Sequence, residues 1–239
     1  SPSCMLIAGE ASGDTLGAEL IKALRPLAPE MRFFGAGGPK LAGEGMELAF
    51  DLSAHAVVGI WEVVKNYGKF KRFFNRLLAL AAERRPDFVV LIDYPGFNLR
   101  FARALRASAA WKPKIVYYVS PQIWAWHESR VHQIARDLDL LLAIFPFEKS
   151  WYAERKPDFR VEFVGHPLVD RYPQEASAKH SERTLLLLPG SRVREINKHL
   201  PPMLAAARQH GGELEMVLPN EDLHRLAQSL GDLGGIKVR

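Results

Sequence analysis

The sequence has little of what would mark several classes of protein. It contains one cysteine, Cys4, so a disulfide within the chain and a cysteine-rich metal site are both excluded. No apolar run approaches the roughly 20 residues that span a bilayer. No secretory signal peptide is visible, and no low-complexity segment or short repeat occurs. Cys4 itself lies in a short apolar run, which predicts a packed thiol in a reducing compartment.

The net charge does not identify a class of binding partner either. The 239 residues include 32 Lys and Arg against 27 Asp and Glu, which gives a net charge of +5. This mild excess does not require a nucleic-acid partner, and it is compatible with an anionic substrate or an anionic membrane surface. A hydrophobic content of 48% is ordinary for a soluble globular protein, and the length suffices for one domain or one and a half.

Residues 4–24 predict a strand, a glycine-containing turn and a helix. Residues 4–8 form an apolar run long enough for a buried strand. The apolar residues that follow recur at helical spacing, and they are Leu16, Leu20, Ile21 and Leu24. We expect Ser12 and Asp14 to cap the start of this helix. The segment is the first half of a βαβ unit, from which parallel sheets are built.

The turn lies where open α/β sheets bind ligands, at the carboxyl end of a strand. Gly9 and Gly13 allow a ligand to approach the backbone closely because no Cβ intervenes. The turn lacks the G-x-G-x-x-G pattern of a dinucleotide site, and Glu10 and Asp14 would repel a phosphate. A polar, hydroxyl-rich ligand fits better, and an ordinary strand-to-helix turn is the alternative.

The next segments carry a second strand and two helices. We expect a strand over residues 31–35, a loop around Gly35, Gly37 and Gly38, and a short helix over residues 40–47. A long amphipathic helix is predicted over residues 60–80. Its lysines, arginines and bulky aromatics resemble those of a helix that lies on a membrane. The alternative is a helix whose aromatic face packs on the sheet while its lysines face water.

Asp93 directly follows the strongest strand signal in the chain. Residues 88–92 are continuously apolar, as expected of a central parallel strand. A carboxylate at the end of such a strand can accept a proton from a sugar hydroxyl as a general base. The alternatives are a cap for the next helix and an anchor for the loop.

Two further strand ends carry unusual side chains. A strand over residues 114–119 runs into a loop with Trp124 and Trp126. Aromatic faces stack on sugar rings and line acyl grooves, and the alternative is a hydrophobic plug under the loop. His166 follows a strand over residues 160–164. It is a candidate proton carrier or phosphate partner, and the alternative is a structural role.

The opening pattern repeats after residue 183. Residues 172–183 are polar and without periodicity, which predicts a linker between domains. The elements expected next are a strand over 184–188, helix 195–210, strand 213–218, helix 222–230 and the start of a strand over 236–239. A second Rossmann-like domain is therefore predicted, and it looks incomplete.

The turn of this second repeat differs from the first in its charge. Gly190 and Ser191 precede a helix, whose N-terminal N–H groups bind phosphate readily. Arg192 adds a forked and permanently charged donor. A diphosphate is the expected ligand of this turn.

Six stretches of the chain, in this order, carry a resemblance to a known family. They are residues 8–14 (AGEASGD), 92–98 (IDYPGFN), 118–126 (YVSPQIWAW), 145–148 (FPFE), 164–167 (VGHP) and 188–192 (LPGSR). Together they closely resemble the lipid-A-disaccharide synthases, which are GT-B glycosyltransferases of family 19. The Ser-Pro-x-x-Trp-Ala-Trp stretch is the most specific of them. The resemblance extends from Leu6 to about Val217.

The resemblance implies an α/β protein of GT-B type. It implies an N-terminal Rossmann-like domain over residues 1–171 with a doubly wound parallel sheet, which binds the acceptor and faces the membrane. A linker over residues 172–183 and the start of a UDP-sugar-binding Rossmann-like domain over residues 184–239 follow. In the family the two domains face one another across a cleft.

The resemblance also implies an activity. The family transfers 2,3-diacylglucosamine from UDP-2,3-diacylglucosamine to 2,3-diacylglucosamine 1-phosphate (lipid X), which yields a β-1,6-linked disaccharide 1-phosphate and UDP. It does so as a peripheral protein on the cytoplasmic face of the inner membrane of Gram-negative bacteria. No metal, cofactor or nucleic acid is implied, and a homo-oligomer is compatible with this interpretation.

Residue roles follow the matching motifs. Asp93 matches the general base, and Gly190, Ser191 and Arg192 match the contacts of the UDP diphosphate. The helix near residues 60–80 matches the region that meets the membrane and acyl chains, which favours the membrane interpretation. The substrate-binding residues suggested by the resemblance are Gly9, Glu10, Ser12, Gly13, Asp14, Ser120, Gln122, Trp124, Trp126 and His166.

Two alternatives remain at this point. Members of the family continue well past residue 239 with a segment that binds the uridine ribose, so an inactive or acceptor-binding fragment is the first alternative. A nucleotide-sugar epimerase, which shares the two-domain layout, is the second. The tryptophan loop and the basic amphipathic helix argue against it, because a soluble epimerase has no acyl chains to hold.

Overall fold

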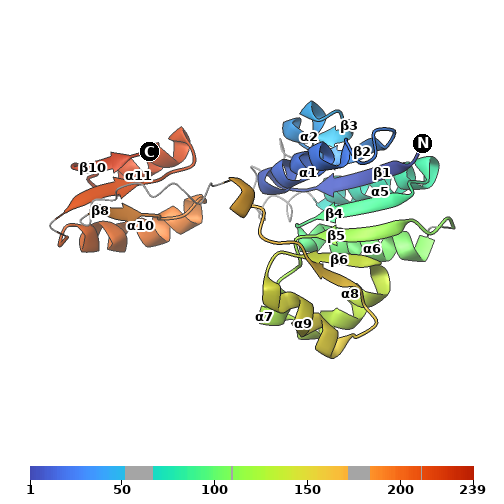
Figure 1. Ribbon diagram of the computed structural model, residues 1–239. Coiled ribbons are helices and arrows are strands. Elements are labelled where there is room, and N and C mark those ends of the chain that lie inside the picture. Colours follow the sequence, from blue (N-terminus) through green and yellow to red (C-terminus); the bar gives the residue numbers. More distant parts are fainter. Residues whose placement is uncertain (52–66, 109, 172–183, 211) are drawn as a thin grey trace. The chain divides into compact units, whose positions relative to one another are not determined.

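A computed structural model describes residues 1–51, 67–108, 110–171, 184–210 and 212–239 (Figure 1). The chain divides into two compact units, Ser1–Arg171 and Tyr172–Arg239, and each is described by itself. The expected linker over residues 172–183 lies outside the described residues. Every strand pair among the described residues is parallel.

The first unit contains a seven-stranded sheet with the strand order β3-β2-β1-β4-β5-β6-β7. Its strands are β1 (Ser3–Ala8), β2 (Arg32–Gly37), β3 (Glu47–Asp51), β4 (Phe88–Ile92), β5 (Lys114–Tyr118), β6 (Leu140–Ala143) and β7 (Val161–Phe163). The direction of the strand order reverses between the paired strands β1 and β4. Ligands of open α/β sheets bind outside the carboxyl ends of the strands at such a point.

Helices cover both faces of this sheet (Figure 1). They are α1 (Ala11–Leu24), α2 (Pro39–Gly43), α5 (Tyr67–Arg84), α6 (Pro95–Ser108), α7 (Ile123–Trp126), α8 (Val131–Asp137) and α9 (Pro146–Arg155), with 3₁₀ turns at Glu128–Arg130 and Val169–Arg171. Successive residues of a strand point to opposite faces. Met5 and Ile7 of β1 accordingly pack in the core under α5 and α6, whereas Leu6 and Ala8 pack under α1 and α2.

The expected thiol at the start of the chain is packed as predicted. Cys4 is 2% exposed and belongs to the core under α1 and α2. Burial raises the pKa of its thiol to about 12, because the apolar surroundings disfavour the thiolate.

The expectations for residues 31–47 are wrong in two respects. Strand β2 continues to Gly37, so Gly35 and Gly37 lie in the sheet and not in a loop. Gly35 has a φ of +144°, and a Cβ there would lie 2.0 Å from the carbonyl oxygen of Leu6 in β1. Only glycine permits this approach, so its presence reflects close strand packing. The helix ends at Gly43, and Glu47–Asp51 forms an additional edge strand, β3.

The second unit repeats the strand–turn–helix pattern. Its elements are β8 (Thr184–Leu187), α10 (Val193–Ala207), β9 (Glu213–Met216), α11 (Glu221–Leu230) and β10 (Ile236–Val238), and the strand order is β10-β9-β8. Ile196, Leu200 and Leu204 of α10 lie at helical spacing and are buried with Met216 in one core. Asn220 caps α11, because its side chain accepts a hydrogen bond from the Leu223 N–H at 3.0 Å. The expected α/β class with two parallel sheets is confirmed.

Candidate functional site

Asp93 lies in a turn with an unusual backbone at the end of β4. Asp93 and Tyr94 both have a φ of +47°, a left-handed conformation that costs a non-glycine residue roughly 1–2 kcal/mol. Three hydrogen bonds hold this turn. The carbonyl oxygen of Asp93 accepts two of them, from Tyr117 Oη at 2.6 Å and from Asn98 Nδ2 at 2.8 Å. In the third, the backbone N–H of Asp93 donates to the carbonyl oxygen of Tyr118 at 3.0 Å. The surrounding structure therefore determines where Asp93 is placed.

The carboxyl group of Asp93 is half-buried beside this turn. Burial raises its pKa, and a hydrogen bond from the Tyr94 N–H lowers it to a smaller extent. Within the described part of the chain, no ion pair with a cation offsets this burial. A carboxylate of raised pKa is a stronger base, so this position suits proton abstraction.

The turn after β1 contacts the turn that carries Asp93. A Cβ on Gly9 would lie 2.4 Å from Cδ1 of Tyr94, so the tyrosine ring fills the space next to this glycine. The ring in turn stacks on Phe97, with 6.0 Å between the ring centroids and 19° between their planes. Gly13 is buried behind the same turn. The structure therefore brings residues 9–13 and Asp93 together at the switch point.

The expected capping of α1 is wrong. The helix begins at Ala11, so Ser12 lies in its first turn with an exposed side chain. Glu10 occupies the N-cap position, and its side chain makes no capping hydrogen bond. The exposed side chains of Glu10 and Ser12 are therefore available to a polar ligand.

Asp14 is an anchor for α2 instead. It is 3% exposed, and its carboxylate lies at the N-terminus of that helix. Three backbone N–H groups donate to it, those of Gly38 at 2.8 Å, Lys40 at 3.0 Å and Leu41 at 3.1 Å. The sequence does not reveal this role because the partners are 24 to 27 residues away. Asp14 thus fixes the start of α2, and its carboxylate is buried there.

The strand ends beyond β4 carry an aromatic cluster of Trp124, Phe145, Phe147 and His166. Trp124 meets Phe147 edge-on at 5.1 Å between ring centroids. Phe147 stacks on Phe145 at 5.9 Å, and Phe145 lies 5.9 Å from the His166 ring. These contacts join the loops that follow β5, β6 and β7. His166 Nδ1 accepts a hydrogen bond from the Leu168 N–H at 3.2 Å, which orients its ring.

Glu148 is a residue that sequence reasoning did not select. It is fully buried, and its two carboxylate oxygens accept hydrogen bonds from Trp124 Nε1 at 3.2 Å and from the Phe145 N–H at 3.1 Å. Glu148 at the third position of α9 supplies one half of a capping box, but the other half needs a side-chain acceptor at the N-cap, and Phe145 has none. The bond to Trp124 joins two loops and could not be predicted from the sequence.

The remaining residues of the tryptophan loop differ in exposure. Trp126 is 80% exposed, and Gln122 is exposed too, so both present their side chains to solvent. Ser120 is buried beside Tyr152 and lowers the pKa of that phenol, although burial raises it more strongly. In the described residues neither hydroxyl makes a hydrogen bond of normal geometry. Trp126 is therefore the more exposed of the two tryptophans, and Trp124 packs within the aromatic cluster.

Two aromatic residues of the long amphipathic helix, Phe73 and Phe74, pack against the core of the first unit. Residues 60–66 lie outside the described residues, and α5 begins at Tyr67. Phe74 meets Phe97 and Phe101 of α6 at 5.4 and 5.8 Å between ring centroids, and Leu77 is fully buried. Phe74 and Leu77 therefore follow the alternative of a packed helix face. No described helix is both long and apolar enough to cross a bilayer.

In the second unit, the turn before α10 is built around Glu195. Gly190 has a φ of +123°, and Arg192 is the N-cap residue of the helix, as expected for a phosphate-binding turn. However, the Ser191 N–H donates to Glu195 Oε2 at 2.9 Å, and Arg192 Nη1 lies 3.5 Å from Glu195 Oε1. The sequence-predicted anion site therefore already contains a carboxylate of the chain itself.

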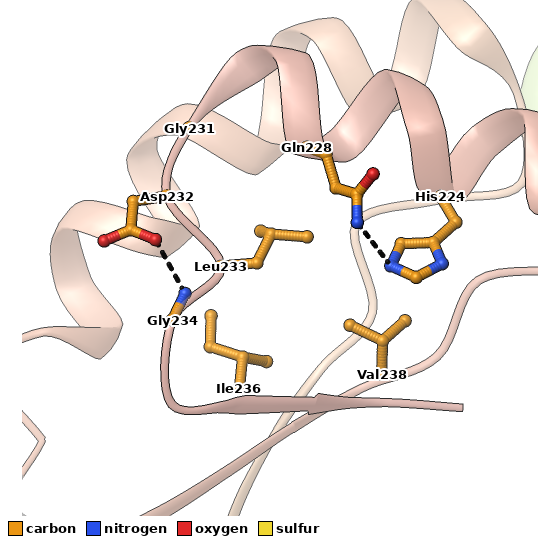
Figure 2. Close-up of a pocket in the computed structure, with 8 residues that line it drawn as sticks. All are labelled: His224, Gln228, Gly231, Asp232, Leu233, Gly234, Ile236 and Val238. Carbon is orange, nitrogen blue, oxygen red and sulfur yellow. Dashed lines mark hydrogen bonds between the residues drawn. The ribbon is translucent and has the colours of Figure 1, made fainter.

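A separate hollow of about 560 Å³ lies between α11 and β10 (Figure 2). Asp232 accepts a hydrogen bond from the Gly234 N–H at 2.8 Å, and Gln228 Nε2 lies 3.4 Å from a His224 ring nitrogen. The polar side chains that line this hollow thus interact with residues close to them in the chain. None of the site residues predicted from the sequence lines the hollow. Among the described residues, no group of three His, Cys, Asp or Glu side chains is placed to hold a metal.

Comparisons with known proteins agree on one family. Residues 4–220 match a family model described as lipid-A-disaccharide synthetase. The chain is 43% identical over 230 residues to the lipid-A-disaccharide synthase of Myxococcus xanthus, covering 91% of this chain and 59% of the relative. It is 41% identical to that of Acidobacterium capsulatum, covering 92% of this chain and 56% of the relative. The chain thus spans about three fifths of the length of these relatives.

Solved structures show the same fold at low identity. A Staphylococcus aureus MnaA–UDP structure matches with a TM-score of 0.63 at 16% identity, covering all of this chain and 68% of the other. The calicheamicin glycosyltransferase CalG4 matches with a TM-score of 0.54 at 17% identity, covering all of this chain and 70% of the other. These similarities confirm the expected GT-B-like fold class.

Proposed function

Because the chain belongs to the lipid-A-disaccharide synthase family, we propose that it acts in glycosyl transfer between two acylated glucosamines. The donor is UDP-2,3-diacylglucosamine, and the acceptor is 2,3-diacylglucosamine 1-phosphate. The products are the β-1,6-linked disaccharide 1-phosphate and UDP. The observation that carries the proposal is Asp93, a carboxyl of raised pKa in a constrained turn at the switch point of the sheet.

Asp93 is the proposed general base. As the 6-oxygen of the acceptor bonds to the anomeric carbon of the donor, its proton passes to the Asp93 carboxylate. The bond between that carbon and the diphosphate breaks at the same stage, through an oxocarbenium-like state. Proton transfer to a positioned carboxylate contributes roughly 10²–10⁴-fold to the rate of such reactions.

The second unit supplies the charge stabilisation for the leaving group. UDP departs with additional negative charge on its diphosphate. Backbone N–H groups at Gly190 and Ser191 and the guanidinium of Arg192 are the donors suited to this charge. Stabilisation of developing charge by fixed donors is the main means by which an enzyme without a metal performs this step.

Exposed polar and aromatic side chains at the carboxyl edge of the first sheet are proposed to hold the acceptor. Glu10 and Ser12 offer polar contacts for its hydroxyls, and Trp126 offers an exposed face for a sugar ring or an acyl chain. The remaining members of the proposed substrate site are Gly9, Gly13, Ser120, Gln122, Trp124 and His166. Asp14 contributes by fixing the turn.

We also propose that the first unit contacts the cytoplasmic face of the inner membrane. Helices α5 and α6 are neighbours and carry exposed cations, namely Lys71, Arg72, Arg76, Arg100 and Arg103. Basic residues near an anionic bilayer contribute about 1 kcal/mol each to its binding. The attraction then comes from these cations, and Phe73 and Phe74 of α5 remain packed against the core.

Product analysis tests this function. The chain would be incubated with both lipid substrates in detergent micelles, and the products would be identified by mass spectrometry. The disaccharide 1-phosphate is the expected product. Binding of the acceptor without any product would reduce the chain to a binding module, and a UDP-sugar epimer would identify an epimerase.

A further inference from the structure

We propose that Glu195 competes with the donor diphosphate for the start of α10, so that the diphosphate binds only by displacing its carboxylate. The inference rests on the proposed function, because the competing ligand is the UDP of that site. Glu195 would then set how tightly the chain holds UDP before and after transfer.

The carboxylate of Glu195 engages the same groups that the diphosphate needs. Its Oε2 accepts a hydrogen bond from the Ser191 N–H at 2.9 Å, and its Oε1 lies 3.5 Å from Arg192 Nη1. The Ser191 and Arg192 N–H groups together with the Arg192 charge lower the pKa of Glu195, which keeps it ionised at neutral pH. A negatively charged group therefore occupies the donors of this turn.

Glu195 also fills the space beside Gly190. A Cβ added to Gly190 would lie 2.5 Å from Glu195 Cβ and 2.7 Å from its Oε2. This is the side from which a phosphate approaches a glycine backbone, because no Cβ intervenes there. The Glu195 side chain thus contacts three groups at once: the Ser191 N–H, the Arg192 guanidinium and the open face of Gly190.

Two anions cannot share these donors. An N–H group makes one strong hydrogen bond, and two negative charges at van der Waals distance repel each other. Glu195 is only partly buried, so its side chain is able to rotate into solvent when a diphosphate arrives. When UDP leaves, the carboxylate caps the helix again, and the N–H groups do not remain unpaired.

The test follows the amides of the turn directly. UDP would be titrated into the ¹⁵N-labelled full chain while the Gly190 and Ser191 amide signals are recorded. The variants are Glu195→Gln, Glu195→Ala and Arg192→Ala. Glu221→Gln serves as the matched control, because it removes the same charge at the first position of α11 in the same unit. Circular dichroism would verify that each variant is folded.

We expect Glu195→Gln and Glu195→Ala to lower the Kd for UDP about tenfold, while Glu221→Gln leaves it unchanged. Equal or weaker UDP binding by both Glu195 variants would overturn the inference while the diphosphate site itself stands, provided that Arg192→Ala weakens binding. If UDP does not shift these amides in any variant, or if Arg192→Ala binds as well as the unmodified chain, the proposed diphosphate site fails, and the inference fails with it.

Discussion

The hydroxyl of Tyr117 donates a hydrogen bond to the backbone carbonyl of Asp93 at 2.6 Å, from a ring that is completely buried. Tyr117 lies in β5, so the bond connects this strand to the turn that follows its neighbour β4. It acts on the backbone of Asp93 and leaves the carboxylate free. Tyr117 is therefore a positioning residue for the proposed base.

Replacing Tyr117 by Phe removes this bond and nothing else. A neutral hydrogen bond contributes about 1 kcal/mol, so we expect turnover to fall roughly fivefold with little change in KM. In an Asp93→Asn background the same replacement should have no further effect on turnover, because Tyr117 acts through Asp93. Steady-state kinetics of the four proteins measure this coupling.

Tyr152→Phe is the matched control for Tyr117→Phe. It also deletes a buried phenolic hydroxyl, but this one makes no hydrogen bond of normal geometry within the described residues. We expect its turnover to equal that of the unmodified chain. A decrease as large as that of Tyr117→Phe would assign the effect to core packing and would contradict the positioning role.

Gly9→Ala tests the contact between the two turns. The added Cβ would lie 2.4 Å from the Tyr94 ring, which is held against Phe97, so the turn that carries Asp93 must shift. Overpacking of this kind costs about 1–3 kcal/mol of stability, and we expect turnover to fall with it. Gly96→Ala is the control, because a Cβ there meets no atom within 4 Å. The melting temperature and the turnover would be measured for both variants. Equal values for Gly9→Ala and Gly96→Ala would contradict the proposed contact between the two turns.

Asp93→Asn should stabilise the fold at neutral pH. Burial raises the pKa of Asp93 above the ordinary value of about 3.9, so the folded state disfavours the charge. Stability is therefore lost as pH rises from the ordinary carboxyl pKa through the raised one. We expect Asp93→Asn to melt above the unmodified chain at pH 7 and level with it below about pH 3.9. Asp158 is exposed, so Asp158→Asn should melt at the same temperature as the unmodified chain at both pH values. If Asp93→Asn melted below the unmodified chain at pH 7, burial would not be the cause of the effect.

Trp126 and Trp124 should respond differently to replacement by Ala. Trp126 is 80% exposed, so its loss should weaken acceptor binding several-fold without lowering the melting temperature. Loss of Trp124 should lower the melting temperature, because this ring packs on Phe147 and bonds to Glu148. Leu27→Ala is the control for exposure, since Leu27 is also 80% exposed but follows the C-terminus of α1. Calorimetric titration with the acceptor in micelles would measure acceptor binding by the three variants. Unchanged binding by Trp126→Ala would exclude Trp126 from the proposed site.

Much of the fold was predictable because central parallel strands are buried on both faces. The continuous apolar run of Phe88–Ile92 indicates β4 directly, and the position of Asp93 follows from it. The edge strand Glu47–Asp51 was not predictable in this way. It lies at the edge of the sheet and pairs with β2 alone, and its sequence is only partly apolar.

The functional surroundings were less predictable because their partners are distant in the chain. Asp14 lies among small polar residues that suggest a ligand, yet its oxygens bind amides 24 to 27 residues further on. Trp124 depends on Glu148, which is 24 residues away. The motif residues therefore indicated where the proposed site lies, and the contacts show which of their side chains are buried and which are exposed.

Acceptor-dependent release of UDP by the unmodified chain and by Asp93→Asn tests the central claim most directly. The measurement uses UDP-2,3-diacylglucosamine with and without 2,3-diacylglucosamine 1-phosphate at pH 7. The account predicts release that requires the acceptor and that falls roughly 10²–10⁴-fold in Asp93→Asn. Acceptor-dependent release that is equally fast in a folded Asp93→Asn variant would contradict it.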